Sequence, residues 1–133
     1  EPKKSVYNKH FLANTFEEEV NIYLDQLHDI VSCIKNMGYF KIPYQDSNGI
    51  WRSYIPDFVV KINENEYCFI ETKGAEYIND PIKKNALKKY VDDCNKVQSE
   101  KKYTSLYVLD DKFRNLDNKP SSFSKFFELF KDL

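Results

Sequence analysis

The sequence predicts a single α/β domain, built as a mixed β-sheet flanked by helices. Two long segments carry apolar residues at helical spacing, and short runs rich in aromatic and β-branched residues lie between turn signals. The predicted order is helix, three strands, helix, strand, helix (α-β-β-β-α-β-α). A chain of 133 residues with 41% apolar content can bury one core, and no repeat or linker divides it.

The first helix is predicted to begin near residue 15 and to run through residue 34. Thr15 and Glu18 have the spacing of a capping box. One helical face would carry Phe16, Val20, Leu24, Leu27, Val31 and Ile34. Gly38 lies just past the expected end, where glycine commonly terminates a helix. Residues 1–13 have mixed composition and are expected to form an N-terminal arm.

Four segments are predicted to hold strands, at residues 39–44, 50–62, 66–72 and 104–109. Asn48-Gly49 is typical of a tight turn, and residues 63–65 form another. These short connections predict antiparallel neighbours, whereas the last strand follows a helix and should return parallel.

The second helix is predicted to begin at Asp80-Pro81, an acidic N-cap followed by proline. Its apolar stripe leaves a lysine-rich face, which is expected to be mainly solvated. A final short helix should follow Ser121 or Ser122 and should bury a row of phenylalanines (Phe123, Phe126, Phe127 and Phe130).

Composition argues against several functional classes. The net charge of −1 argues against a protein that coats nucleic acid through bulk electrostatics. There is no glycine-rich phosphate loop, and no apolar run approaches the roughly 20 residues that cross a bilayer. Three cysteines without CxxC spacing favour buried, reduced thiols, so we expect a cytoplasmic protein that makes no membrane contact.

Two carboxylates and a lysine mark the ends of adjacent predicted strands. Asp57 begins one strand and Glu71 ends its antiparallel neighbour, so both should reach the same edge of the sheet. Glu71 and Lys73 are two residues apart and should project from one face. Mg²⁺ prefers oxygen ligands and usually takes one or two carboxylates. We therefore predict an Mg²⁺ site, with Mn²⁺ as a substitute, at Asp57, Glu71 and the backbone carbonyl of Thr72.

Lys73 would either orient the attacking hydroxide or stabilise charge that develops on a phosphate bound at this site. The alternative is structural, with Lys73 paired to one of two strand-end carboxylates. Apolar residues precede both carboxylates, and a charge beside a core is costly without a partner or a metal. This favours a site that hydrolyses phosphodiesters.

The motif Pro56-Asp57 … Glu71-Thr72-Lys73 resembles that of the PD-(D/E)XK nuclease superfamily, whose core is the restriction-endonuclease-like α/β fold. Residues 10–112 also resemble the C-terminal nuclease domain of type III restriction enzyme Res subunits and related helicase-linked nucleases. That similarity rests on Phe16-Glu17 through Leu24-Asp25, Ile42–Tyr44, Tyr54–Phe58, Glu71–Gly74, Asp80, Lys83, Ala86 and the Tyr90…Asn95 spacing. Tyr90 departs from the tryptophan often found there.

The resemblance implies an Mg²⁺-dependent DNA endonuclease with a helicase or translocase domain in the same polypeptide, and with a methyltransferase or specificity subunit as a further partner. A chain that begins at Glu1 is accordingly expected to be an excerpt of a larger protein. The single nuclease domain (1–133) would comprise the arm (1–13), a family-like core (14–112) and a C-terminal helix (113–133).

The family also carries an acidic residue on the first helix that assists the metal site, and Glu17 is the best match. Its alternative role is to stabilise the helix N-terminus. Lys83, in the first turn of the second helix, is expected to contact phosphate, with a solvated lysine as the alternative. Arg52 and Trp51 follow the turn and could grip or stack on nucleic acid, although packing is the expected role of Trp51.

Two other functions remain open. The chain could be a catalytically inactive DNA-binding or docking module of the same fold. It could also be a phosphodiesterase that acts on small nucleotides, which would require a closed pocket of nucleotide size.

Overall fold

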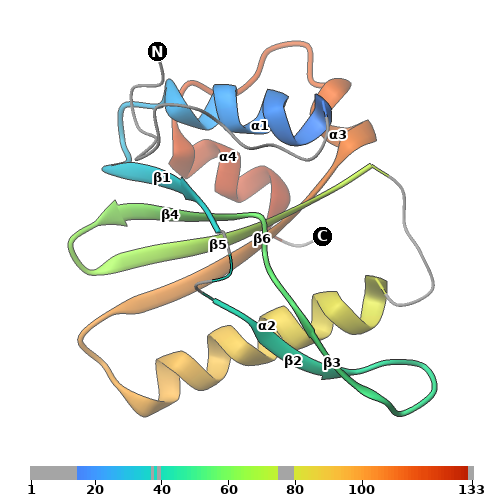
Figure 1. Ribbon diagram of the computed structural model, residues 1–133. Helices are drawn as coiled ribbons and strands as arrows, with labels where there is room; N and C mark the ends of the chain where they lie inside the picture. Colours follow the sequence, from blue (N-terminus) through green and yellow to red (C-terminus); the bar gives the residue numbers. More distant parts are fainter. Residues whose placement is uncertain (1–14, 37, 39, 75–79, 132–133) are drawn as a thin grey trace.

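The computed structural model describes residues 15–36, 38, 40–74 and 80–131 and confirms a mixed α/β architecture. Its elements are α1 (Thr15–Asp25), β1 (Ser32–Lys35), β2 (Ile42–Gln45), β3 (Trp51–Tyr54), β4 (Phe58–Asn63), β5 (Glu66–Lys73), α2 (Asp80–Val97), β6 (Lys102–Leu109), α3 (Asp110–Arg114) and α4 (Phe123–Phe130). Four strands form a mixed sheet in the order β1-β4-β5-β6, and β2 and β3 form a separate hairpin (Figure 1).

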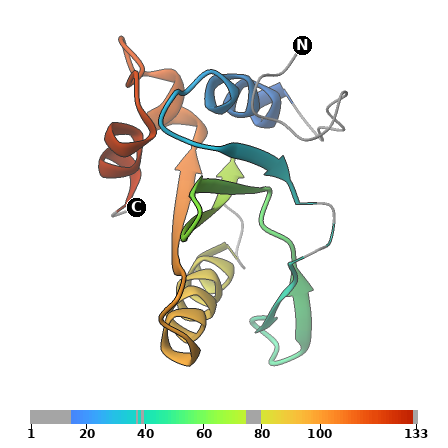
Figure 2. The same cartoon turned by 90° about the vertical axis from the view of Figure 1, so that its left-hand side faces the viewer.

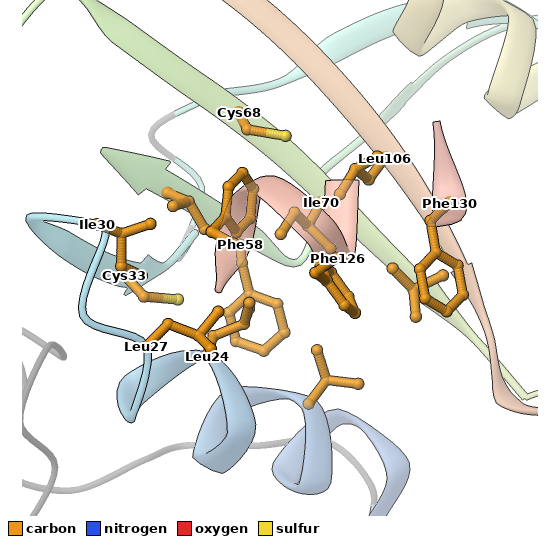
Figure 3. Packing of buried hydrophobic residues seen from close by; sticks show 14 of the residues in the cluster. Leu24, Leu27, Ile30, Cys33, Phe58, Cys68, Ile70, Leu106, Phe126 and Phe130 are labelled. Atoms are coloured by element: carbon orange, nitrogen blue, oxygen red, sulfur yellow. The ribbon is translucent and has the colours of Figure 1, made fainter. Parts of the chain in front are cut away.

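Helices cover both faces of the four-stranded sheet. In Figures 1 and 2, α1, α3 and α4 lie on one side, while α2 and the β2–β3 hairpin lie on the other. Alternate side chains of each strand point to opposite faces. Phe58, Ile70 and Leu106 therefore pack beneath α1 and α4 (Figure 3), whereas Val59 and Phe69 pack against α2 and the hairpin.

Strand β5 is a central strand of the sheet, between β4 and β6. It pairs antiparallel with β4, placing Phe58 opposite Ile70, and parallel with β6, placing Glu71 opposite Tyr107. The parallel pairing follows the crossover through α2. Both the antiparallel neighbours and the parallel return predicted from the sequence are confirmed.

The predicted length of the first helix is wrong. α1 ends at Asp25, where Gln26 and Leu27 donate backbone hydrogen bonds to carbonyls three residues earlier and tighten the last turn. Residues 32–35 instead form β1, which pairs with β4. Leu27 is buried as predicted, but from a loop, whereas Val31, which was also predicted on the buried face, is 49% exposed. Gly38, with φ of +100°, follows a strand.

The stretch predicted to hold one strand, residues 50–62, holds two. These are β3, which pairs with β2, and β4, which begins directly after Asp57 as predicted and pairs with β1 and β5. Pro56 lies at the break, where it lacks an N–H for either ladder. The predicted turn between β2 and β3 is present, with Gly49 at φ of +78°. The strand predicted at 39–44 lies at 42–45, and Tyr39 is outside the described residues.

The helical signals later in the chain are confirmed. α2 begins at Asp80-Pro81, and Ser122 caps α4 by accepting a hydrogen bond from the Lys125 N–H at 3.2 Å. The capping side chains of Thr15 and Asp80 and the arm at residues 1–13 lie outside the described residues. All three cysteines are free, with Cys33 and Cys68 buried. No helix in the described ranges is both long enough and apolar enough to cross a membrane.

Candidate active site

Asp57 lies directly before β4, at the point where the chain leaves the hairpin and enters the sheet. Its backbone carbonyl accepts a hydrogen bond from the Asn36 N–H at 2.8 Å, which ties it to the end of β1. Its side-chain Oδ2 accepts hydrogen bonds from the Thr72 N–H at 2.8 Å and from the Thr72 hydroxyl at 2.5 Å. The carboxylate is therefore fixed against β5.

Glu71 is buried in β5, beside Thr72. Its Oε1 has no hydrogen-bond partner among the described residues. The pKa of Glu71 is raised to about 8, first by burial and then by the charge of Asp57 and a hydrogen bond with Asp57, while Lys73 opposes the shift. The charge of Asp57 thus disfavours ionisation of Glu71, and a cation bound at the site would offset this effect.

Lys73 projects from the same face of β5 as Glu71. Its Nζ lies 3.5 Å from Glu71 Oε2, and its side chain is 19% exposed. The structure thus brings Asp57, Glu71 and Lys73 together at the junction of β4 and β5. The side chains converge as the strand positions require.

Thr72 has a role that the sequence did not suggest. Its N–H and hydroxyl both hold Asp57, whereas the predicted role of its carbonyl as a metal ligand stays a prediction. Within the described ranges, no group of three or more His, Cys, Asp or Glu side chains is arranged to hold a metal ion. The candidate site therefore offers two carboxylates, which suffices for Mg²⁺ when water and phosphate supply the other ligands.

Glu17 is buried on α1 and forms an ion pair with Lys35 of β1. Lys35 Nζ also lies 5.8 Å from the centre of the Phe58 ring, on the face that α1 covers. The charged groups that shift the pKa of Glu71 are Asp57 and Lys73, and Glu17 is not among them. The structure places Glu17 with Lys35, and its assistance to the metal site stays a prediction.

Arg52 and Lys83 come together from separate elements around the ring of Tyr44. Lys83 Nζ of α2 lies 5.9 Å from the ring centre, and Arg52 is the cross-strand partner of Tyr44 in the hairpin. Arg52 Nε donates to Asp46 Oδ2 at 2.5 Å, and this contact is the main cause that lowers the pKa of Asp46. The two predicted phosphate contacts therefore share one surface.

Tyr54 was missed by the sequence analysis. Its hydroxyl is buried and has no hydrogen-bond partner among the described residues. Burial, followed by the charges of Glu71 and Asp57, raises its pKa, so the hydroxyl lies within the influence of the carboxylate pair. Its position three residues before Asp57 was a signal, but the break at Pro56 hid the direction of the side chain.

Tyr107 and Lys84 were also missed. Tyr107 lies opposite Glu71 in the β5–β6 register, and Lys84 Nζ of α2 lies 5.3 Å from the centre of its ring. Only knowledge of the parallel register would have placed them beside the site.

Trp51 is 68% exposed, so the packing role expected for it is wrong. It stands at the start of β3, opposite Gln45. Its indole is therefore available on the surface of the hairpin.

One protein family, described as TnsA-like endonuclease N terminal, has a model that matches residues 28–109, more than half of the chain. The match includes Asp57, Glu71 and Lys73, and Glu17 lies outside it. A search of curated proteins and a search of solved structures each found no match.

Proposed function

The chain belongs to the TnsA-like endonuclease N-terminal family, and on this basis we propose that it is the catalytic domain of an Mg²⁺-dependent DNA endonuclease. The family supports nuclease activity in general terms. The observation that supports the metal site is the convergence of Asp57 and Glu71 beside Lys73, with Glu71 Oε1 buried and without a hydrogen-bond partner among the described residues.

Asp57 and Glu71 would hold the ion. A bound Mg²⁺ supplies Lewis acidity toward the scissile phosphate and lowers the pKa of a water molecule. Thr72 keeps Asp57 aligned with two hydrogen bonds, so its carboxylate needs little reorganisation when a ligand arrives. Glu71 must give up its proton before it can bind a cation, because its pKa is about 8.

Lys73 would neutralise charge on the phosphate. Its ammonium group lies within 3.5 Å of Glu71 and is partly exposed, so it can turn from the carboxylate toward a bound phosphodiester. The position of Lys73 beside the carboxylates suits the stabilisation of charge that develops during in-line attack.

The partners of the domain are part of the proposal. DNA is the proposed substrate, a helicase or translocase domain in the same polypeptide would deliver it, and a methyltransferase or specificity subunit would select it. These partners rest on the resemblance to type III restriction Res subunits, which the family match leaves untested. A cytoplasmic location goes with the same proposal.

Cleavage of supercoiled plasmid tests the activity. We expect nicked or linear product with Mg²⁺ or Mn²⁺, none with EDTA, and a loss of at least about 100-fold in Asp57→Ala and Lys73→Ala. Asp92→Ala, on the exposed face of α2, is the control and should cleave normally. DNA binding without cleavage, in the presence of metal and of the full-length parent protein, would instead support the inactive docking module.

A further inference from the structure

A cleft of about 410 Å³ is lined by residues of the β2–β3 hairpin and of α2. Both elements lie on one side of the sheet (Figure 2), the side toward which Phe69 and, by strand alternation, Glu71 and Lys73 project. Side chains that line it include Tyr44, Trp51, Ile82 and Tyr90. Its volume is within the range of ~300–1,000 Å³ that is typical of ligand-binding clefts. The cleft is therefore large enough to receive a planar group.

Two tyrosine rings lie between the cleft and the carboxylate pair. The Tyr44 ring contacts the Tyr54 ring, with centres 6.3 Å apart and planes at 76°. The charges of Glu71 and Asp57 act in turn on the Tyr54 hydroxyl. A ligand in the cleft would therefore be separated from the proposed site of cleavage by the Tyr44 and Tyr54 rings.

The two elements that bound the cleft carry a net positive charge, while the charged residues that line it, Lys89 and Asp93, form an ion pair. Residues 41–54 and 80–97 contain seven Lys and Arg against four Asp, a net charge of +3 within a chain whose total is −1. The Asp46 carboxylate is engaged within the hairpin, because it accepts hydrogen bonds from Asn48 N, Ile50 N and Arg52 Nε. Arg52, whose side chain is 53% exposed, has four further N–H donors that could meet a phosphate.

We propose that this cleft binds an unpaired strand of DNA, with a base stacked on Trp51 and with backbone phosphates contacting Arg52 and Lys83. The inference rests on the proposed nuclease function and specifies the form of its substrate. Aromatic side chains beside a basic surface are the usual means of binding single strands, because every base offers a face for stacking. In an intact duplex those faces are covered by neighbouring base pairs, so the exposed indole favours a strand that is locally unpaired.

Trp51 is the single tryptophan of the chain, so its fluorescence reports on the cleft without further labelling. The test titrates a mixed-sequence 12-nucleotide single strand, and separately the matching duplex, into the chain in EDTA at low salt. We expect the single strand to quench Trp51 and to bind more tightly than the duplex. The anisotropy of a labelled strand measures affinity independently of the indole.

Variants test which side chains contact the single strand. Trp51→Ala should weaken single-strand binding about tenfold, and Trp51→Phe should restore most of it, because a stacked base contributes ~1–3 kcal/mol. Ile22→Ala, at an apolar residue of α1 that is 48% exposed, should bind normally. Arg52→Gln and Lys83→Gln should lower affinity and the salt dependence of binding, unlike Lys125→Gln on α4.

Four outcomes would overturn the inference: no binding of the single strand at low salt, binding without a change in Trp51 emission, equal affinity of Trp51→Ala, or a dimer of this chain that Trp51→Ala dissociates. Cleavage of plasmid by a protein with any of these properties would leave the proposed nuclease function standing. Quenching by the single strand in a protein that cleaves nothing would support the cleft and reject the nuclease.

Discussion

Thr72 holds Asp57 with both its backbone N–H and its hydroxyl, so the first carboxylate of the candidate site is fastened to the residue that follows the second, Glu71. A threonine between the glutamate and the lysine of the motif thus joins β4 to β5 at the site. This contact makes the geometry of the pair depend on a side chain that need not contact the ion.

Thr72→Val tests the hydroxyl contact with Asp57 separately from the backbone N–H contact. The hydroxyl is lost while the β-branched shape and the N–H contact remain, so we expect a loss of about 1 kcal/mol in the free energy of unfolding. Because Asp57 would be less firmly oriented, metal affinity should fall by a few fold. Urea denaturation and calorimetric titration with Mn²⁺ measure the two effects. The control is Thr104→Val, on β6, which should leave metal affinity unchanged. If Thr104→Val lowers Mn²⁺ affinity as much as Thr72→Val does, Thr72 has no specific role at the site.

The stability of the metal-free protein should fall as pH rises from 5 to 9. The pKa of Glu71 is near 4.5 in the unfolded chain and about 8 in the folded chain, so between these values the folded state binds more protons. Stability then decreases with increasing pH, by up to ~1.4 kcal/mol per pH unit from this group. Glu71→Gln resembles the protonated acid and lacks this penalty.

Thermal unfolding in EDTA tests the direction of this change of stability with pH. We expect the Tm of Glu71→Gln to exceed that of the wild type at pH 8 and the difference to shrink toward pH 5. A difference that is constant across this range would mean that Glu71 ionises normally. Mn²⁺ affinity of the wild type should also increase between pH 6 and pH 8, as Glu71 loses its proton.

The buried ion pair of Glu17 and Lys35 should contribute to the free energy of unfolding. Lys35→Met removes the cation that pairs with the buried Glu17 carboxylate, and we expect a loss of about 2 kcal/mol or more in unfolding free energy. Adding Glu17→Gln removes the buried negative charge and should restore part of that loss. If the double variant is less stable than Lys35→Met alone, Glu17 does not depend on Lys35.

The core of the site could be predicted from the sequence because it depends on strand alternation and short turns. Asp57, Glu71 and Lys73 lie within 17 consecutive residues, and one antiparallel pairing suffices to bring them together. Tyr107 and Lys84 reach the site through the parallel return of β6 and the packing of α2, which are long-range features. Their positions cannot be read from local spacing.

The errors in the fold have the same origin. Val31 and Ile34 continue the helical spacing of α1, but residues 32–35 gain more by pairing with β4 as an edge strand. The exposed position of Trp51 could not be anticipated either, because an aromatic residue at a strand start is equally compatible with packing. Glu17 was matched to the family's acidic helix residue by its sequence neighbours, and its contact with Lys35 depends on β1, a strand that the sequence analysis did not foresee.

The most direct test of the central claim is calorimetric titration of Mn²⁺ at pH 8 into the wild type, Asp57→Ala, Glu71→Ala and Asp92→Ala. We predict one saturable binding event in the wild type and in Asp92→Ala, and its loss in the other two variants, with circular dichroism verifying that each is folded. Unchanged Mn²⁺ affinity in both folded variants, Asp57→Ala and Glu71→Ala, would contradict the proposal that these carboxylates share a cation.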